Sequence, residues 1–320
     1  AISASESGLT QTIQPLQVDS LLQLFLSRMT ASGIDVTQPV EVVSAPNLKI
    51  VEYFGRVATK DPRLSACVAT VTGACEEAFQ TPAFDEFVMV LEGTVDMVHG
   101  AKGNATTTVK AGEAVYLRAG TRVKWRWSGP CKYVPICLPA FSPENCHREV
   151  EEGSNIAKSA DAMKALKQLH AAAQFPLLMH VAQKELWEAC KKEGKTYYPP
   201  TYKQDGFTHA TADASKLVPV LNHFYKSMPG EWICLCTTQQ ALAEQGVQTV
   251  FENTAPVGDT PAVDMGDQLF PHLLGGIPAA GAVQVELPVQ RASDGTFIAI
   301  PGLDKLVREA ESQRLGVNRA

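Results

Sequence analysis

The spacing of apolar residues along the chain changes twice. Over residues 18–29 apolar side chains recur every three or four positions, which predicts an amphipathic helix that ends at Gly33. From residue 48 to 138 the pattern becomes short runs of β-branched and aromatic residues separated by Gly, Pro and Asn. These runs predict eight strands, at 49–57, 67–71, 86–91, 94–98, 106–109, 114–117, 122–127 and 133–138. Short strands at this spacing favour an antiparallel sandwich or barrel.

The second half mixes helical and strand patterns. Residues 154–174 have a sparse apolar face followed by Pro176, which predicts a solvated linker helix. Further strands are expected at 177–181, 206–210, 232–236, 247–251, 282–287 and 297–300, and further helices at 184–192, 214–226 and 305–314. Strands and helices mixed in this way are typical of an α+β domain.

These changes divide the chain into two domains and three connecting or terminal segments. The expected segments are an N-terminal helical extension (1–45), an all-β barrel (46–153), a helical linker (154–175), an α+β domain (176–302) and a C-terminal helical tail (303–320). Because each half has its own periodicity, we expect two fragments separated within the linker to fold independently.

Composition and charge exclude several classes of protein. With 45% hydrophobic and 19% charged residues, the chain has the composition of an ordinary soluble globular protein. Each half holds 14 basic and 17 acidic residues, so the net charge of −6 divides into −3 and −3. Neither half therefore has the basic excess that binding to nucleic acid requires. No apolar run approaches the roughly 18 residues that a membrane span needs.

The eight cysteines include no CxxC pair and are too sparse for a disulfide-stapled scaffold. We therefore expect reduced thiols and a reducing intracellular compartment. Cys234 and Cys236, on one strand face, are expected to be small buried apolar residues rather than metal ligands. The sequence starts at Ala-Ile-Ser rather than Met, so we expect that residues before Ala1 were removed, and organelle import is one of the explanations left open. The expected location is the cytoplasm or, after removal of a targeting segment, an organelle interior.

Two glycine-bounded segments in the β-rich stretch resemble the signatures of the cupin superfamily, a jelly-roll barrel. The first, 86–93, is expected to be a hairpin closed at Gly93, and the second, 112–120, contains a tight turn at its end. The triplet Phe84-Asp85-Glu86 at the start of the first segment resembles, more specifically, the EutQ-like cupins of the ethanolamine-utilisation type. This resemblance covers about residues 49–139.

The cupin resemblance also implies that the usual metal site is absent. Metal-binding cupins take two His and one Glu from the first signature and a further His from the second. Only the Glu remains here, as Glu86. The upstream positions hold Gln80 and Pro82, or Phe79 and Thr81 if the spacing is one longer, and the downstream position holds Val123. One carboxylate cannot supply the three or four ligands of a transition metal, so we expect no metal in the cupin pocket.

Asp85 and Glu86 are the candidate ligand-binding residues of the barrel. Consecutive strand residues point to opposite faces, so only one of the two can point inward. Two interpretations remain open. Either the two residues form a paired acid site, with one raised pKa or with a bound cation, or a solvated Asp lies beside an inward Glu held by hydrogen bonds. Nearby cations alternate with apolar residues, which favours a charged outer strand face over an anion-binding surface; these cations are Arg118, Arg122, Lys124 and Arg126.

Three histidines of the second half stand in distinctive contexts: His180 in the strand at 177–181, His209 in the strand at 206–210, and His272 in Phe-Pro-His. The apolar neighbours of His180 alternate onto the other strand face, so its ring is expected to point away from the core. Together with Trp187 and the pair Phe251-Glu252, these motifs resemble the family known as domain of unknown function 952, over about residues 177–301.

That resemblance implies an ADP-ribosyltransferase-like fold, in which NAD binds in a cleft between two small sheets. It also implies catalytic roles. His180 would engage the adenosine-side ribose and the nicotinamide region, and His209 would position the nicotinamide ribose. The third role falls to Glu252 or to His272, and the sequence leaves that choice open. Cleavage of an N-glycosidic bond builds positive charge on the sugar, which explains why carboxylates and hydroxyl-binding groups are needed.

Thr211, two residues after His209, is expected to point the same way and to bind a ribose or phosphate. Tyr225 belongs to the same motif pattern and is the other expected ligand-binding residue of this domain. Purely structural histidines are the competing interpretation. A three-histidine zinc site is disfavoured, because no two of these histidines have a local metal-ligand spacing.

The sequence thus predicts NAD-using ADP-ribosyl transfer or glycohydrolase activity in the C-terminal domain, with a metal-free cupin as a binding module. The alternative is a catalytically inactive binding or accessory subunit of a larger assembly. NAD is the expected substrate, and a small-molecule or nucleotide ligand the expected partner. A homodimer through the cupin, or incorporation into a larger complex, is also expected from the resemblance.

Overall fold

The computed structural model describes residues 36–100, 102–149 and 160–315. The helix predicted at 18–29 lies outside these residues, as does the start of the predicted linker helix. The remainder of that linker forms α2 (Ala160–Gln174), and the predicted closing helix is α7 (Leu303–Leu315). None of the described helices has the length and apolar character needed to cross a membrane.

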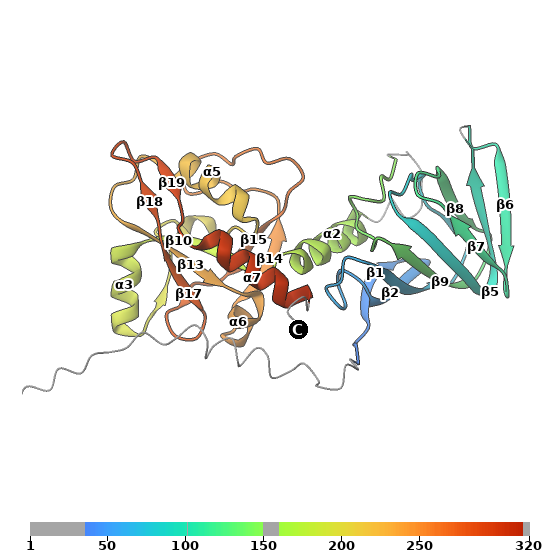
Figure 1. Cartoon of the computed structure of the whole chain (residues 1–320), viewed down its shortest axis with the longest axis horizontal. Coiled ribbons are helices and arrows are strands. Elements are labelled where there is room, and N and C mark those ends of the chain that lie inside the picture. Colours follow the sequence, from blue (N-terminus) through green and yellow to red (C-terminus); the bar gives the residue numbers. More distant parts are fainter. Residues whose placement is uncertain (1–35, 101, 150–159, 316–320) are drawn as a thin grey trace, which may run out of the picture. The chain divides into compact units, whose positions relative to one another are not determined.

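The first region is an antiparallel β half-barrel (Figure 1). Its strands are β1 (Val40–Ala45), β2 (Leu48–Phe54), β3 (Ser65–Val71), β4 (Cys75–Glu76), β5 (Asp85–His99), β6 (Ala105–Lys110), β7 (Ala114–Leu117), β8 (Val123–Trp127) and β9 (Cys131–Leu138). Neighbours in the sheet follow the order β1-β2-β3-β9-β5-β8-β4, and β6 and β7 also pair with β5. Strand β1 lies within residues that were assigned to the helical extension, so that part of the assignment is corrected.

Alternation along β8 confirms the predicted charged outer face. Val123, Trp125 and Trp127 are buried in the barrel core, whereas the side chains between them lie on the outer surface. The cations of this face have acidic partners: Arg122 pairs with Glu149 at 2.6 Å, and Arg126 with Asp96 at 3.4 Å. Two of the cations of this face are therefore balanced by acidic residues of the chain itself.

The hairpin predicted at Gly93 is wrong. Strand β5 continues through Gly93, pairing with β9 up to Cys131 and then with β6 from Thr94 onward. Gly93 has a φ of +73°, and a Cβ at this position would lie 2.1 Å from the carbonyl oxygen of Pro130. The glycine thus permits a bend and a close backbone approach within one long strand, a role that sequence spacing cannot distinguish from a turn.

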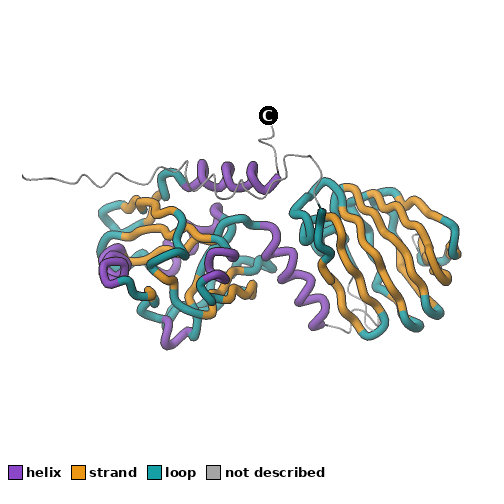
Figure 2. The backbone as a smooth tube through the Cα atoms, turned by 90° about the horizontal axis from the view of Figure 1, so that it is seen from below, coloured by secondary structure: helices purple, strands orange, loops and turns teal. Residues whose placement is uncertain are grey.

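The second region is a mixed α+β arrangement of short helices and small sheets (Figure 2). Its helices are α3 (Lys184–Glu193), α4 (Tyr202–Asp205), α5 (Ala214–Phe224) and α6 (Gln239–Glu244). Its strands are β10 (Leu178–Gln183), β11 (Thr196–Tyr197), β12 (Thr208–His209), β13 (Trp232–Thr237), β14 (Gln248–Glu252), β15 (Phe270–Leu274), β16 (Ile277–Pro278), β17 (Val285–Pro288), β18 (Gln290–Arg291) and β19 (Phe297–Ala299). Two of the described sheets have three strands, in the orders β10-β13-β17 and β12-β15-β14.

Strand β10 is buried on both faces, which corrects the expected position of His180. Met179 and Val181 pack into one apolar cluster, and Leu178 and Ala182 pack into another on the opposite side. His180 lies on the second of these faces and is only 4% exposed. A strand covered on both sides cannot be recognised from the alternation of its apolar residues alone.

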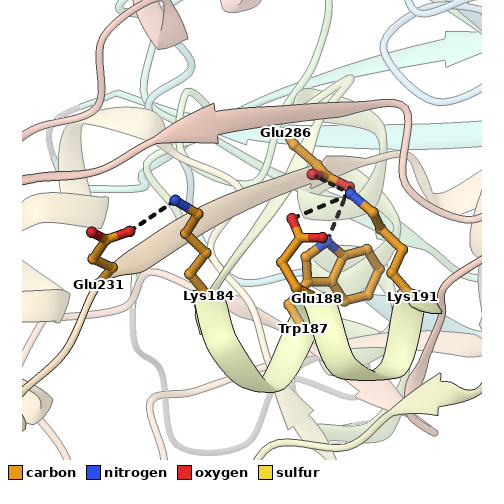
Figure 3. A network of polar contacts seen from close by, with 6 residues as sticks. All are labelled: Lys184, Trp187, Glu188, Lys191, Glu231 and Glu286. Atoms are coloured by element: carbon orange, nitrogen blue, oxygen red, sulfur yellow. Dashed lines mark hydrogen bonds and ion pairs between the residues drawn. The ribbon is translucent and has the colours of Figure 1, made fainter. Parts of the chain in front are cut away.

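Trp187 connects α3 to the far strand of this sheet. Its indole Nε1–H donates to Glu286 Oε1 at 3.0 Å, and Lys191 Nζ binds both oxygens of the same carboxylate at 2.9 Å (Figure 3). The Trp187 ring also meets Tyr197 edge-on at 6.0 Å, and Tyr197 lies 5.6 Å from the ring of His180. This chain of buried contacts holds His180 in place from the side of α3.

We predict that Gly93→Ala destabilises the half-barrel much more than Gly112→Ala. Gly112 also has positive φ, +86°, but a Cβ there would meet nothing within 4 Å. The control should therefore lose only the roughly 1–2 kcal/mol of a left-handed residue. Gly93→Ala should lose a further ~1–3 kcal/mol because the backbone near Pro130 must move. Denaturant unfolding of both variants checks this, and equal losses would show that the close approach is unimportant.

Candidate functional site

The three histidines singled out in the sequence line one cleft in the C-terminal region. His180 comes from β10, His209 from β12 and His272 from β15, and Thr211 and Tyr225 line the same cleft. The volume of this cleft, as a cavity, is about 50 Å³. Five of the six residues predicted in this region for catalysis or ligand binding are therefore brought together, and Glu252 is the exception.

A backbone pairing joins the two three-stranded sheets at this cleft. Met179 and Thr211 exchange two N–H···O=C hydrogen bonds, each 2.8 Å long. In addition, His180 Nδ1–H donates to the backbone carbonyl of His209 at 2.6 Å. The two histidines are thus fixed to each other across the boundary between the sheets, although 29 residues separate them in sequence.

His209 is oriented by Asp205, a residue that the sequence reasoning missed. His209 Nε2–H donates to Asp205 Oδ2 at 3.1 Å, while the other oxygen, Oδ1, accepts the backbone N–H of Gly258 at 3.0 Å. With the proton on Nε2, Nδ1 of His209 carries the lone pair. Burial lowers the pKa of His209 and outweighs the opposing effect of Asp205, so the ring is neutral at neutral pH.

Asp205 could have been found from the segment Asp205-Gly206. Gly206 adopts the left-handed conformation, φ 83°, and ends α4 one residue after the aspartate. The chain then turns back into β12, which places His209 against an acid four residues earlier. An acidic residue that precedes a helix-ending glycine and a strand histidine weakly predicts a contact between the acid and the histidine.

His272 and Glu252 form a second imidazole–carboxylate pair. His272 Nδ1–H donates to Glu252 Oε2 at 3.4 Å, and Glu252 also lies 3.6 Å from Lys164 Nζ. His272 is the cross-strand partner of His209, and Phe207 stacks on the His272 ring at 4.0 Å. Burial lowers the pKa of His272, and the nearby His209 imidazole lowers it further, because two protonated rings would repel each other. The two candidates for the third role are therefore one hydrogen-bonded pair, of which His272 lines the cleft.

His180 has an unused hydrogen-bond acceptor. Burial lowers its pKa to about 4, so the ring is neutral, and its Nδ1 proton is taken by the carbonyl of His209. Nε2 is buried and has no hydrogen-bond partner among the described residues. A buried acceptor of this kind is costly, so it marks a position where a ligand donor would be stabilised.

The rest of the cleft is apolar and aromatic, with a few hydroxyl groups. Helix α5 supplies Leu217, Leu221 and Phe224, and Tyr225 follows directly at its end. Burial raises the pKa of Tyr225 to about 12, so the phenol keeps its proton and remains a hydrogen-bond donor. This wall can accept a planar ring, while the histidines and hydroxyls can bind polar groups.

The lining residues include no Lys, Arg, Asp or Glu. Within the described part of the chain, no group of three or more His, Cys, Asp or Glu residues has an arrangement that could hold a metal ion. The two carboxylates of the site, Asp205 and Glu252, lie behind the imidazoles that they bind. The residues that line the cleft are therefore uncharged, and the negatively charged residues lie behind the histidines that line it.

In the half-barrel, Asp85 and Glu86 separate as the strand geometry requires. Asp85 Oδ1 accepts the backbone N–H of Ala119 at 2.9 Å, in the turn expected at Ala119-Gly120. Glu86 points inward and is 9% exposed. Burial, and then the nearby Glu77, raise the pKa of Glu86 to about 8, so it is largely a neutral acid at pH 7. The inward Glu is confirmed, but the described residues offer it no hydrogen bond of the kind that one interpretation required.

The positions that lack cupin histidines belong to a different polar cluster. Gln80 pairs with Val123 through the backbone, and its Oε1 accepts from Cys146 Sγ at 2.7 Å and from Arg148 Nη2 at 3.4 Å. Arg148 Nη2 also binds Glu77 Oε2 at 3.2 Å. The interior of the barrel therefore holds a glutamate–arginine pair and an amide beside Glu86.

All eight cysteines are free, and Cys234 and Cys236 are fully buried in β13. Their sulfurs lie 3.9 Å apart. The prediction that these two are small buried residues is confirmed.

Comparison with known families identifies the two regions separately. Residues 67–132 match the family model described as EutQ-like cupin domain, and residues 181–285 match the model described as Protein of unknown function (DUF952). Both resemblances drawn from the sequence are confirmed. These matches give no support to the expected ADP-ribosyltransferase-like fold of the second region.

Individual relatives cover only parts of the chain. Endoribonuclease YbeY from Myxococcus xanthus is 33% identical over 103 residues, which is 32% of this chain and 34% of that protein. The chain thus spans about a third of the length of that curated relative. Among solved structures, the Clostridium difficile EutQ protein (15% identity, TM-score 0.24) covers 29% of this chain and 68% of its own. A putative ethanolamine utilization protein from Salmonella typhimurium LT2 (16% identity, TM-score 0.25) covers 33% and 100%. The chain therefore contains one segment that matches the EutQ-like cupin model, residues 67–132, and one that matches the DUF952 model, residues 181–285.

Proposed function

We propose that the C-terminal cleft binds an N-glycoside of the nicotinamide type and cleaves its N-glycosidic bond, as in NAD glycohydrolysis or ADP-ribosyl transfer. The observation that carries this proposal is the pair of carboxylate-backed imidazoles, Asp205–His209 and Glu252–His272, on cross-strand partners facing one cleft. The two neighbouring three-stranded sheets are also consistent with the ADP-ribosyltransferase-like arrangement expected from the sequence.

The charge arrangement suits a transition state that gains positive charge. As the bond between the anomeric carbon and the base nitrogen breaks, the sugar becomes cationic, and nearby negative charge stabilises it. Asp205 and Glu252 supply that charge through His209 and His272. In hydrolysis, His209 Nδ1 would take a proton from the attacking water while the nicotinamide leaves as a neutral base.

Two further residues fit the binding step. Nε2 of His180 would accept a hydrogen bond from a sugar hydroxyl. This buried nitrogen would then have the partner that it lacks among the described residues. The aromatic wall at Phe224 and Tyr225 would contact the base. In the sequence, Thr211 lies between His180 and Phe224. The backbone of Thr211 is hydrogen-bonded to Met179 and joins the two sheets.

We predict that the full chain binds NAD and releases nicotinamide, and that His209→Ala and His272→Ala each weaken binding or turnover by tenfold or more, about 1.4 kcal/mol. His180→Ala should in addition destabilise the protein, because this ring is buried and holds the His209 carbonyl. Calorimetric titration with NAD and chromatographic detection of nicotinamide are the measurements.

His99→Ala is the matched control, because His99 lies in the half-barrel and contacts Thr107 rather than the cleft. It should leave both readouts unchanged. If NAD binds but nicotinamide is never released, the region is a binding module, which is the alternative function. Absence of binding to the folded wild-type chain would refute the proposal.

For the cupin region we propose a metal-free binding module, with Glu86 as its inward acid. The buried neutral carboxyl can donate a hydrogen bond, and the adjacent Glu77–Arg148 pair supplies both signs of charge. This proposal uses Glu86 without Asp85, because Asp85 Oδ1 accepts the backbone N–H of Ala119 in the turn.

We predict that Glu86 makes the folded protein lose stability as pH rises. Its folded-state pKa of about 8 lies above the unfolded value, so its contribution is fully present below about pH 4.3 and is lost as pH rises toward 8. Glu86→Gln, which mimics the neutral acid, should therefore gain on the wild type by up to ~1.4 kcal/mol per pH unit across this window. Urea unfolding from pH 5 to 8 measures this difference.

Glu92→Gln is the control, because Glu92 lies on the same strand but is exposed. Its stability profile should run parallel to that of the wild type. A parallel profile for Glu86→Gln as well would mean that the pKa of Glu86 is the same in the folded and unfolded states, which contradicts the prediction.

A further inference from the structure

The C-terminal cleft offers no positive charge to a phosphate group. Its three imidazoles are neutral at neutral pH, because burial lowers the pKa of each one. No lysine or arginine is among the residues that line it. Phosphate recognition in proteins depends on such side chains or on backbone N–H groups at helix ends.

The helix terminus next to the cleft is also closed to anions. Helix α5 lines the cleft, and Asp213 caps its first turn. Asp213 Oδ1 accepts from Ser215 N at 2.9 Å and from Ser215 Oγ at 2.7 Å, and Oδ2 accepts from Gln268 Nε2 at 3.3 Å. The protein's own carboxylate thus occupies the position where a phosphate would bind a helix N-terminus.

The charges behind the cleft have the same sign. Asp205 is buried, with a side chain 4% exposed, and sits directly behind His209. Glu252 sits behind His272 and is more exposed, with Lys164 nearby. Lys164 partly balances the charge of Glu252, so Asp205 supplies the main negative charge behind the cleft. A phosphate entering the cleft would be repelled by this charge, whereas a cationic base would be attracted.

We infer that the cleft takes the nucleoside part of its substrate, a ribonucleoside with a positively charged base, and that phosphates stay outside it. This inference rests on the proposed function and narrows it. Nicotinamide riboside is the simplest compound of this class. NAD would bind through the same half, and its diphosphate would add no affinity.

The test compares three ligands on the full chain by calorimetric titration: nicotinamide riboside, nicotinamide mononucleotide and NAD. We expect the mononucleotide to bind at least tenfold more weakly than the riboside, and NAD to bind no more tightly than the riboside. Raising the salt concentration from 0.05 to 0.5 M should reduce the gap between riboside and mononucleotide, because salt screens the repulsion.

Variants of the two carboxylates identify the source of the discrimination. Asp205→Asn removes one charge and should reduce the preference for the riboside by threefold or more. Glu252→Gln is the second variant, and it tests the same point at an exposed position that tolerates substitution. Glu309→Gln, on α7 and outside the cleft lining, should leave the preference unchanged.

A mononucleotide that binds as tightly as the riboside, or NAD that binds more tightly than the riboside, overturns this inference. In that case nicotinamide release would still support the proposed function. If none of the three ligands binds to the folded chain, the proposed function and this inference fail together. An unchanged preference in both carboxylate variants would overturn the electrostatic explanation.

Discussion

The C-terminal cleft depends on the hydrogen bonds that join its two small sheets. Met179 and Thr211 exchange backbone hydrogen bonds, and the His180 ring donates to the carbonyl of His209. His180 belongs to one sheet, and the pair His209 and His272 belongs to the other. Without this junction, the backbone hydrogen bonding of the described residues would not hold His180 next to that pair. Because the linking groups are buried, breaking them leaves unsatisfied donors and acceptors, which costs roughly 1–3 kcal/mol for each group. The junction therefore fixes the relative positions of the three imidazoles.

Burial then determines what these imidazoles can do. In a low-dielectric site the uncharged ring is favoured, and a hydrogen bond on one nitrogen selects the tautomer. Asp205 takes the Nε2 proton of His209, and the His209 carbonyl takes the Nδ1 proton of His180. Each ring is left with one defined lone pair, on Nδ1 of His209 and on Nε2 of His180. The same contacts that stabilise the fold thus also set the acid–base character of the cleft.

The sequence located most of this site but misjudged how it is built. Histidine context and family resemblance were sufficient to select His180, His209 and His272. The burial of His180 was missed because β10 is covered on both faces. In such a strand the alternation of apolar neighbours does not predict which face is exposed to solvent. Strand β15 was missed because Pro271 argues against a strand. Asp205 was missed because its role arises from a turn at Gly206 that brings it back to His209, a three-dimensional effect with little local pattern.

Two buried acids show how environment assigns opposite roles to one functional group. Asp205 accepts hydrogen bonds from two N–H donors, those of His209 and Gly258. Glu86 has no such donor among the described residues and lies near Glu77, so burial raises its pKa and keeps the proton on the acid. The cleft consequently presents an acceptor backed by negative charge, whereas the barrel interior presents a donor.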